Sequence, residues 1–195
     1  QNVKELCILD KNGEWQELLG NPNVKNRGTG WGYGGDIATT SKIVDATFAS
    51  VSGVKKEAPK AIFLYTGTTD ANGTTNIATV QSSYKTLVNK IAQKSPSSTI
   101  YLMALCPTKN STTNINRIKV LNEYIKSLAT DKIKFVDTYT PLASGNLANS
   151  KYFYPDNYLG GLGYVKMAQQ MQAALASDFS ELSINVISDE KAEAR

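Results

Sequence analysis

The chain has 195 residues, of which 41% are apolar and 19% charged, as in a globular domain long enough to bury a full core. Lysine and arginine number 21 against 17 acidic residues, and this net charge of +4 is scattered along the sequence, which argues against nucleic acid as a partner. No run approaches the roughly 20 apolar residues of a membrane span. Cysteine and histidine spacing gives no metal site, and no cofactor is expected.

Short apolar runs alternate along the chain with longer amphipathic ones, a pattern typical of βαβ units around a parallel sheet. The expected strands are Glu5–Leu9, Asn23–Asn26, Ala61–Tyr65, Thr99–Leu105 and Lys132–Val136. The expected helices are Glu14–Leu19, Ile37–Ser52 with Asp36 as its cap, Ile77–Gln93, Asn114–Leu128 and Tyr164–Ala176. The sequence therefore predicts one α/β domain, a three-layer α/β/α sandwich, over residues 1–178. Residues 179–195 are expected to form a tail, in which Ser183–Ile187 could add an edge strand.

Ligands of such sheets bind beside the carboxyl ends of the strands, so the segments that follow the strands are the candidate site. The two cysteines, Cys7 and Cys106, lie in apolar runs and are expected to be buried free thiols. A glycine-rich loop spans residues 28–35, but it lacks the Lys-Ser/Thr ending of a phosphate-binding loop. A nucleotide site is therefore not expected.

Several of these segments resemble, in order, the sequence blocks of the SGNH/GDSL hydrolases, particularly the small acetylesterase-like branch. EWQELLGNPNVKNRG resembles the segment that follows the family's first block and leads into its second. The second to fifth blocks are resembled by GGDIATT, IFLYTGTTDAN, IYLMALCP and YFYPDNYLGGLGY, and Leu9-Asp10-Lys11 stands where the first block has Gly-Asp-Ser. The resemblance implies a flavodoxin-like parallel five-stranded sheet in the order 2-1-3-4-5. It also implies acyl-ester hydrolysis by a serine in the first block and an Asp and a His in the fifth. The serine N–H, a glycine of the second block and an asparagine of the third form the family's oxyanion hole.

Carried over position by position, the resemblance leaves most of this machinery absent. Lys11 stands at the nucleophile's position, and Leu159 stands at the histidine's position. Gly35 keeps the glycine of the oxyanion hole, Thr69 replaces its asparagine, and Asp156 keeps the acid. A hydroxyl nucleophile needs a base, and the oxyanion needs donors already in place.

No shift of alignment restores the missing residues. The first serine anywhere in the chain is Ser41, and the chain contains no histidine. The resemblance therefore implies that the family's reaction has been lost.

Lys11 has two alternative roles in the vacated site. An ion pair with Asp156 would neutralise a carboxylate that is costly to bury alone. A buried lysine of lowered pKa could instead act as base or nucleophile, although a nearby carboxylate favours the protonated amine.

The glycine-rich loop also carries Trp31 and Tyr33, which have two alternative roles. They could fold inward as a lid, or they could present flat faces on which sugars stack. Tyr154 and Tyr158 lie on the fifth-block segment and would enlarge such a surface, which also suits a protein partner.

The favoured prediction is a non-catalytic pseudoenzyme whose remodelled pocket binds a small molecule or a glycan. One alternative is an esterase or deacetylase that acts on acyl esters or O-acetylated carbohydrate through a non-standard catalytic set. Another is a protein-interaction module. Because small members of this branch are often exported, an extracytoplasmic location, periplasmic or secreted, is expected. The ligand and the oligomeric state are left open.

Overall fold

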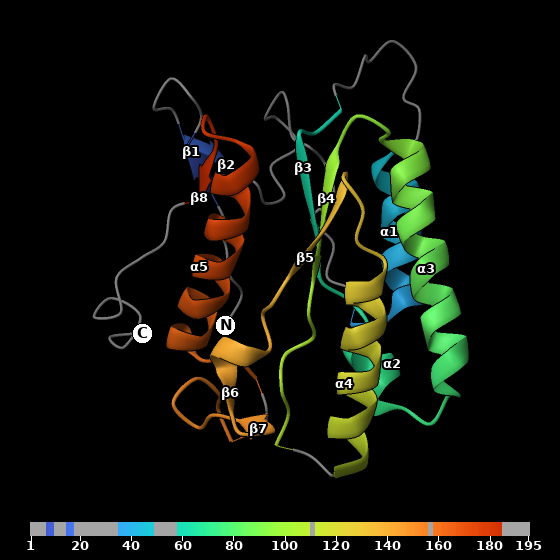
Figure 1. Cartoon of the computed structure of the whole chain (residues 1–195), viewed down its shortest axis with the longest axis vertical. Coiled ribbons are helices and arrows are strands. Elements are labelled where there is room, and N and C mark those ends of the chain that lie inside the picture. The colour runs from blue at the N-terminus through green and yellow to red at the C-terminus, as the bar shows by residue number, and fades with distance from the viewer. Residues whose placement is uncertain are drawn as a thin grey trace.

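The computed structural model describes residues 7–9, 15–17, 35–48, 58–109, 112–155 and 158–184. Its centre is a parallel sheet of β3 (Ala61–Leu64), β4 (Thr99–Met103) and β5 (Ile133–Val136), in the order β3-β4-β5 (Figure 1). Three of the expected strands and their relative order are thus confirmed. They are short and mostly apolar, as suits strands that are covered on both faces, although β5 contains Lys134.

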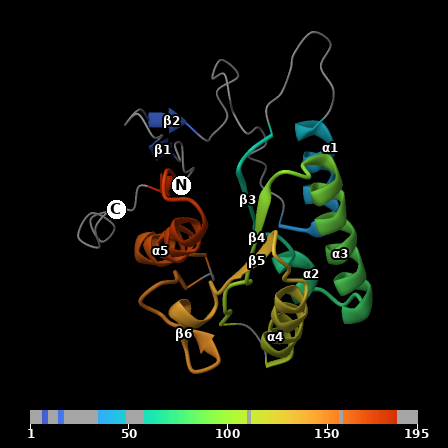
Figure 2. The ribbon, with the colours of Figure 1, turned by 45° about the horizontal axis from the view of Figure 1, so that its top comes forward.

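Helices cover both faces of this sheet. One face carries α1 (Ile37–Thr47), α2 (Thr68–Asn72), α3 (Ile77–Lys94) and α4 (Thr112–Ser127), and the other carries α5 (Gly161–Asp178) (Figures 1 and 2). The amphipathic pattern explains this docking, since α3 buries Val80, Tyr84, Leu87, Val88 and Ile91 on one side. The predicted α/β class with three layers is confirmed.

The two faces of the sheet bury different amounts of apolar surface. On the α1–α4 face, residues of all four helices join Leu64, Ile100 and Leu102 of the strands in one large buried cluster. On the α5 face, the fully buried cluster is limited to Tyr101, Met103, Val136 and Leu175. Partly buried side chains, Met167 and Met171 among them, complete the packing there.

After β5 the chain forms small elements at the carboxyl end of the sheet. These are a 3-10 turn, η1 (Thr140–Leu142), and a hairpin of β6 (Ala143–Ser144) and β7 (Leu147–Ala148). Gly145 turns this hairpin with φ +62°, a conformation that glycine adopts without strain.

The amino-terminal expectations need correction. β1 (Cys7–Leu9) pairs antiparallel with β2 (Trp15–Glu17) and with β8 (Ser183–Ile184), so the described part of the chain does not form a five-stranded parallel sheet in the order 2-1-3-4-5. The helix expected over Glu14–Leu19 is wrong. A helix this short is marginal by itself, whereas pairing with β1 satisfies the backbone of Trp15–Glu17 in a strand.

Other expectations fall outside the described structure or stay untested. The strand expected at 23–26 lies outside the described residues, and the domain boundary at 178 stays a prediction. The first long helix ends at Thr47, earlier than expected. Among the helices that the structure describes, none is long and apolar enough to cross a membrane.

Candidate functional site

The amino end of α1 is closed by two carboxylates that follow different strands. The Asp36 carboxylate accepts the Thr39 amide at 2.7 Å and the Thr39 hydroxyl at 2.8 Å, which confirms Asp36 as the cap. Asp70, in α2, accepts the Ile37 amide at 2.9 Å. The bonds from Thr39 lower the pKa of Asp36 below its ordinary value. These carboxylates occupy amide donors that an anionic ligand would otherwise use.

The two predicted oxyanion-hole positions are held directly against each other. The Thr69 amide donates to the Gly35 carbonyl at 3.0 Å. The hydroxyls of Thr40 and Thr66 lie 2.6 Å apart, and each also lies within hydrogen-bond distance of the Asp36 carbonyl, at 3.0 Å and 3.2 Å. Because its amide is engaged with Gly35, Thr69 can offer a ligand only its exposed side chain.

Arg117 of α4 holds α2, in the third-block segment, in place through hydrogen bonds to backbone carbonyls. Its guanidinium donates to the carbonyls of Ala71 at 2.8 Å, Asp70 at 3.1 Å and Thr75 at 2.7 Å. These carbonyls lie in and after α2, a helix of five residues. Charge-assisted bonds to helix-end carbonyls explain why so short a helix persists.

The carboxyl end of β4 is held by polar side chains from its neighbours. The Asn122 amide group accepts from the Leu105 N–H at 2.7 Å and donates to the Leu105 carbonyl at 2.9 Å. The Thr138 hydroxyl donates to the Ala104 carbonyl. All of these groups are buried, so the segment after β4 has a single conformation available at low energy.

Cys106 comes next, and it is a buried free thiol, as predicted. Burial raises the pKa of the Cys106 thiol to about 12 and the pKa of the Tyr65 phenol well above its ordinary value. The Tyr65 hydroxyl accepts the Cys106 amide at 3.2 Å. A thiol that stays protonated at neutral pH is a poor nucleophile. Cys106 is therefore not an activated nucleophile.

The fifth-block segment forms a small hairpin before α5. Its backbone bonds run from the Tyr154 amide to the Tyr158 carbonyl and from the Gly160 amide to the Tyr152 carbonyl, each at 2.8 Å. Phe153 and Leu159 pair across it in an antiparallel bridge. This pairing turns Phe153 and Leu159 toward the same apolar cluster.

Leu159, which the sequence predicts at the position of the family's histidine, is a packing residue. Its side chain lies against a cluster of Cys106, Leu142, Ala148 and Phe153. An imidazole there would lie among apolar groups, and a charged imidazolium would be disfavoured.

Gly163 lets α5 approach this hairpin closely. A Cβ atom at Gly163 would lie 2.5 Å from the Tyr152 carbonyl oxygen and 2.6 Å from Leu159 Cδ2. No side chain larger than hydrogen fits there without a shift of backbone. The Gly-Tyr pair of the fifth block therefore has a structural role in docking α5.

Three tyrosines beside this hairpin are exposed: Tyr154 by 48%, Tyr158 by 66% and Tyr164 by 50%. Tyr154 and Tyr158 were expected at a ligand surface from the sequence, and Tyr164 was not. Tyr164 lies in the first turn of α5, where its amide donates to the Gly160 carbonyl at 3.1 Å. One indication of this exposure is present in the sequence: Tyr164 follows Gly163 directly and is not one of the buried positions of the helix, such as Val165 and Leu175.

Four predicted site residues, Lys11, Trp31, Tyr33 and Asp156, lie outside the described residues. The ion pair between Lys11 and Asp156 therefore stays a prediction. Among the described residues, no group of three or more His, Cys, Asp or Glu side chains could hold a metal ion.

In the described part of the chain, a parallel sheet is covered by helices on both faces and has polar groups at the carboxyl ends of its strands. The sequence model of the GDSL-like Lipase/Acylhydrolase family matches residues 10–166, and the chain belongs to this family. No curated protein sequence matches the chain.

Solved structures show the same fold at low sequence identity. A protein named as a candidate platelet activating factor from Streptococcus pneumonia aligns with a TM-score of 0.61 and 17% identity, over 72% of this chain and 68% of that one. A GDSL-like lipase from Bacteroides thetaiotaomicron aligns at 0.57 and 16%, over 74% and 72%. A carbohydrate esterase of family 3 from Talaromyces cellulolyticus aligns at 0.50 and 17%, over 61% of this chain and 58% of that one.

Proposed function

We propose that this chain is a non-catalytic member of the GDSL family that binds a glycan beside the fifth-block hairpin. The observation that carries the proposal is the packing of Leu159, which we assign to the histidine's position, into an apolar cluster in a chain without histidine. Without a base, a hydroxyl nucleophile is not activated, and the ester bond has no route to cleavage by the family's mechanism.

The serine that comes first in the chain does not supply a substitute nucleophile. Ser41 lies in α1, and its hydroxyl accepts a hydrogen bond from the Lys90 amine at 2.6 Å. The same amine forms an ion pair with Asp45 at 2.9 Å. A protonated lysine held by a carboxylate donates protons and cannot take one from serine. This cluster ties α1 to α3 and is best explained as structural.

The glycan part of the proposal rests on the exposed tyrosines. Tyrosine rings offer a flat apolar face with a polar edge, which matches the apolar faces and hydroxyl rims of sugars. Tyr154, Tyr158 and Tyr164 lie within one short stretch at the carboxyl end of the sheet, where α/β folds bind ligands. The fold likeness to a carbohydrate esterase is consistent with this ligand class.

The first test is hydrolysis of an aryl acetate by the purified protein, with a Lys11→Ala variant beside it. We expect no turnover above that of the variant, because exposed lysines give only slow background acylation. Saturable turnover that disappears in Lys11→Ala or Asp156→Asn would contradict the proposal and would establish an esterase with a non-standard catalytic set.

The second test is binding of a neutral β-1,4-linked oligosaccharide, with and without O-acetyl groups, by calorimetry. Tyr154→Ala and Tyr158→Ala should each weaken binding about tenfold, because a stacked aromatic ring contributes on the order of 1 kcal/mol or more. Val120→Ala is the matched control, since Val120 on α4 is equally exposed at 48%. Absence of sugar binding, together with tyrosine-dependent capture of a protein, would favour an interaction module instead.

We also propose an extracytoplasmic location, which follows from the resemblance to exported members of this branch. Fractionation of the native host with an antibody against the chain tests it. Recovery only with cytoplasmic markers would contradict the proposal.

A further inference from the structure

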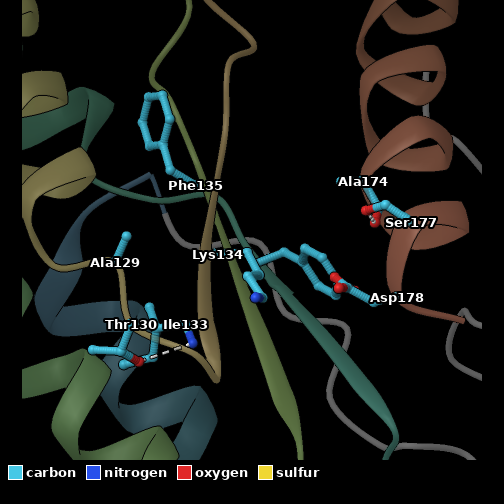
Figure 3. A pocket seen from close by; sticks show the side chains of 9 residues that line it. Ala129, Thr130, Ile133, Lys134, Phe135, Ala174, Ser177 and Asp178 are labelled. Carbon is cyan, nitrogen blue, oxygen red and sulfur yellow. Dashed lines mark hydrogen bonds between the residues drawn. The ribbon is translucent and has the colours of Figure 1, made fainter.

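A second candidate site lies away from the family's site, where the start of β5 meets the end of α5. The lining of this cavity of about 290 Å³ includes the first residues of β5, Ile133 and Lys134, and the last residues of α5, Ser177 and Asp178 (Figure 3). Ile133 opens its strand and Asp178 ends its helix, so the cavity lies toward the amino ends of the strands. The hairpin and its tyrosines lie toward the carboxyl ends. The cavity's volume is near the lower limit for small-molecule sites.

Two opposite charges line this cavity without pairing with each other. Lys134 extends from β5 to the side on which Asp178 extends from α5 (Figure 3). Within the described part of the chain, the half-buried Lys134 amine has no hydrogen bond or ion pair. The side chain of a surface lysine normally extends into water. Lys134, by contrast, is half-buried, and in the sheet it is paired with the buried Tyr101 of β4.

Asp178 is held in place by Tyr101. The Tyr101 hydroxyl donates to Asp178 Oδ2 at 2.6 Å. Burial and this bond raise the pKa of the Tyr101 phenol, so the hydroxyl keeps the proton that it donates. The Tyr101 ring is in turn fixed by stacking on Phe63, with ring centroids 4.6 Å apart. One carboxylate oxygen of Asp178 is thus positioned by the fold, and Oδ1 is left for a ligand.

The remaining walls supply apolar contacts and one further donor. Ala129, Ile133 and Ala174 line the cavity with aliphatic surface. The Thr130 hydroxyl oxygen accepts hydrogen bonds from the amides of Lys132 and Ile133, at 3.3 Å and 3.2 Å. The hydroxyl proton is therefore available to donate to a ligand. Figure 3 shows Ala174 on the same side of β5 as Lys134 and Asp178, with Ala129 and Ile133 on the other side of this strand. The aliphatic body of a ligand therefore finds apolar surface at Ala174 beside the two charges and at Ala129 and Ile133 across the strand.

We propose that this cavity binds a small zwitterion, a free α-amino acid with an aliphatic side chain. The ligand carboxylate would pair with the Lys134 amine, and its ammonium would pair with Asp178 Oδ1. A ligand with only a carboxylate could pair with Lys134 but would leave Asp178 unpaired beside a like charge, and a ligand with only an ammonium would do the same at Lys134. A zwitterion offers an opposite charge to each side chain.

The test is a titration of the full chain with L-leucine, followed by NMR amide shifts of β5 and α5. Two analogues of leucine, 4-methylpentanoate without the ammonium and isopentylamine without the carboxylate, serve as matched ligands. We expect saturable binding of leucine, and binding at least about tenfold weaker for each analogue, because each lacks one charge-assisted bond.

Three variants locate the site. Lys134→Met keeps the aliphatic stem, and Asp178→Asn keeps an acceptor for the Tyr101 hydroxyl, so both should fold, which thermal unfolding checks. Each should weaken leucine binding at least about tenfold. Lys132→Met is the control, because exposed Lys132 neighbours the strand but does not line the cavity. No saturation with leucine, equal binding of an analogue, or an equal loss in Lys132→Met would each overturn the proposal.

Discussion

The two faces of the parallel sheet are built differently. The α1–α4 face buries one continuous apolar cluster, and polar side chains such as Asn122 and Arg117 fix the strand and helix ends there. The α5 face buries fewer residues and relies on partly buried methionines. Both candidate sites, the tyrosines and the cavity, adjoin α5. The tightly packed α1–α4 face thus gives the domain its rigidity, and the less tightly packed α5 face leaves room for ligands.

The largest expected effect is a difference in the unfolding free energy that is lost when one buried leucine is truncated on each face. Leu121 is 0% exposed in the large cluster, and Leu175 is 1% exposed in the small one. Leu121→Ala should lower the free energy of unfolding by about 4 kcal/mol and Leu175→Ala by about 2.5 kcal/mol, because flexible methionines can relax into the second cavity. Urea unfolding measures both values, with exposed Val120→Ala as the control. An equal cost at the two positions would remove the distinction between the faces.

The next test concerns the hydrogen bonds between Asn122 and the backbone of Leu105, on the α1–α4 face. Asn122→Ala leaves the buried N–H and C=O of Leu105 without their partner, and it should cost about 3 kcal/mol of unfolding free energy. Asn116→Ala removes an exposed asparagine from the same helix and should change stability by less than about 0.5 kcal/mol. Similar values for the two variants would show that water replaces Asn122 at the strand end.

A smaller effect is expected where α5 meets the hairpin. Gly163→Ala places a Cβ 2.5 Å from the Tyr152 oxygen, and the backbone shift that follows should cost about 2 kcal/mol. Gly160→Ala is the matched control, since its Cβ would lie 3.5 Å from the same oxygen. Gly163→Ala should also weaken oligosaccharide binding, because it displaces Leu159 and the tyrosines. If Gly163→Ala matched Gly160→Ala, the close approach of α5 would have no structural importance.

The sequence predicted the elements whose pattern is local. β3, β4 and β5 are short, mostly apolar runs, interrupted in β5 by Lys134, and the buried residues of α3 recur at helical spacing. The segment around Trp15 was misassigned as a helix because its short mixed pattern fits both periods. Pairing with β1, which in turn pairs with the distant β8, decides it. α2 was missed because Thr-Thr-Asp-Ala-Asn is a poor helix sequence that Arg117 supports from elsewhere in the chain.

The features of the candidate site likewise fall into those that the sequence predicts and those that only tertiary packing creates. The absence of histidine and of any serine before Ser41 is evident in the sequence, and the assignment of Leu159 to the histidine's position stays a prediction. The cluster around Leu159 joins Cys106, Leu142 and Phe153, which come from separate segments and carry no shared motif. Lys134 and Asp178 likewise belong to different elements. Only the docking of α5 on the sheet brings such residues together.

The smallest expected effect concerns the carboxylate that caps α1 on the α1–α4 face. The bonds from Thr39 lower the folded-state pKa of Asp36 from its ordinary value of 3.8. The stability that these bonds contribute is therefore fully present above pH 3.8 and is lost as pH falls below it through the lowered pKa.

Asp36→Asn should keep the cap, because an amide oxygen can accept the Thr39 amide, but it should remove this part of the acid dependence. Urea unfolding of both proteins at a series of acidic pH values measures the difference in slope. Asp131→Asn, which removes an exposed carboxylate outside any described hydrogen bond, is the control for net charge. Parallel curves for wild type and Asp36→Asn would show that the cap acts through its neutral hydrogen bond alone, and that the charge adds nothing to the docking of α1.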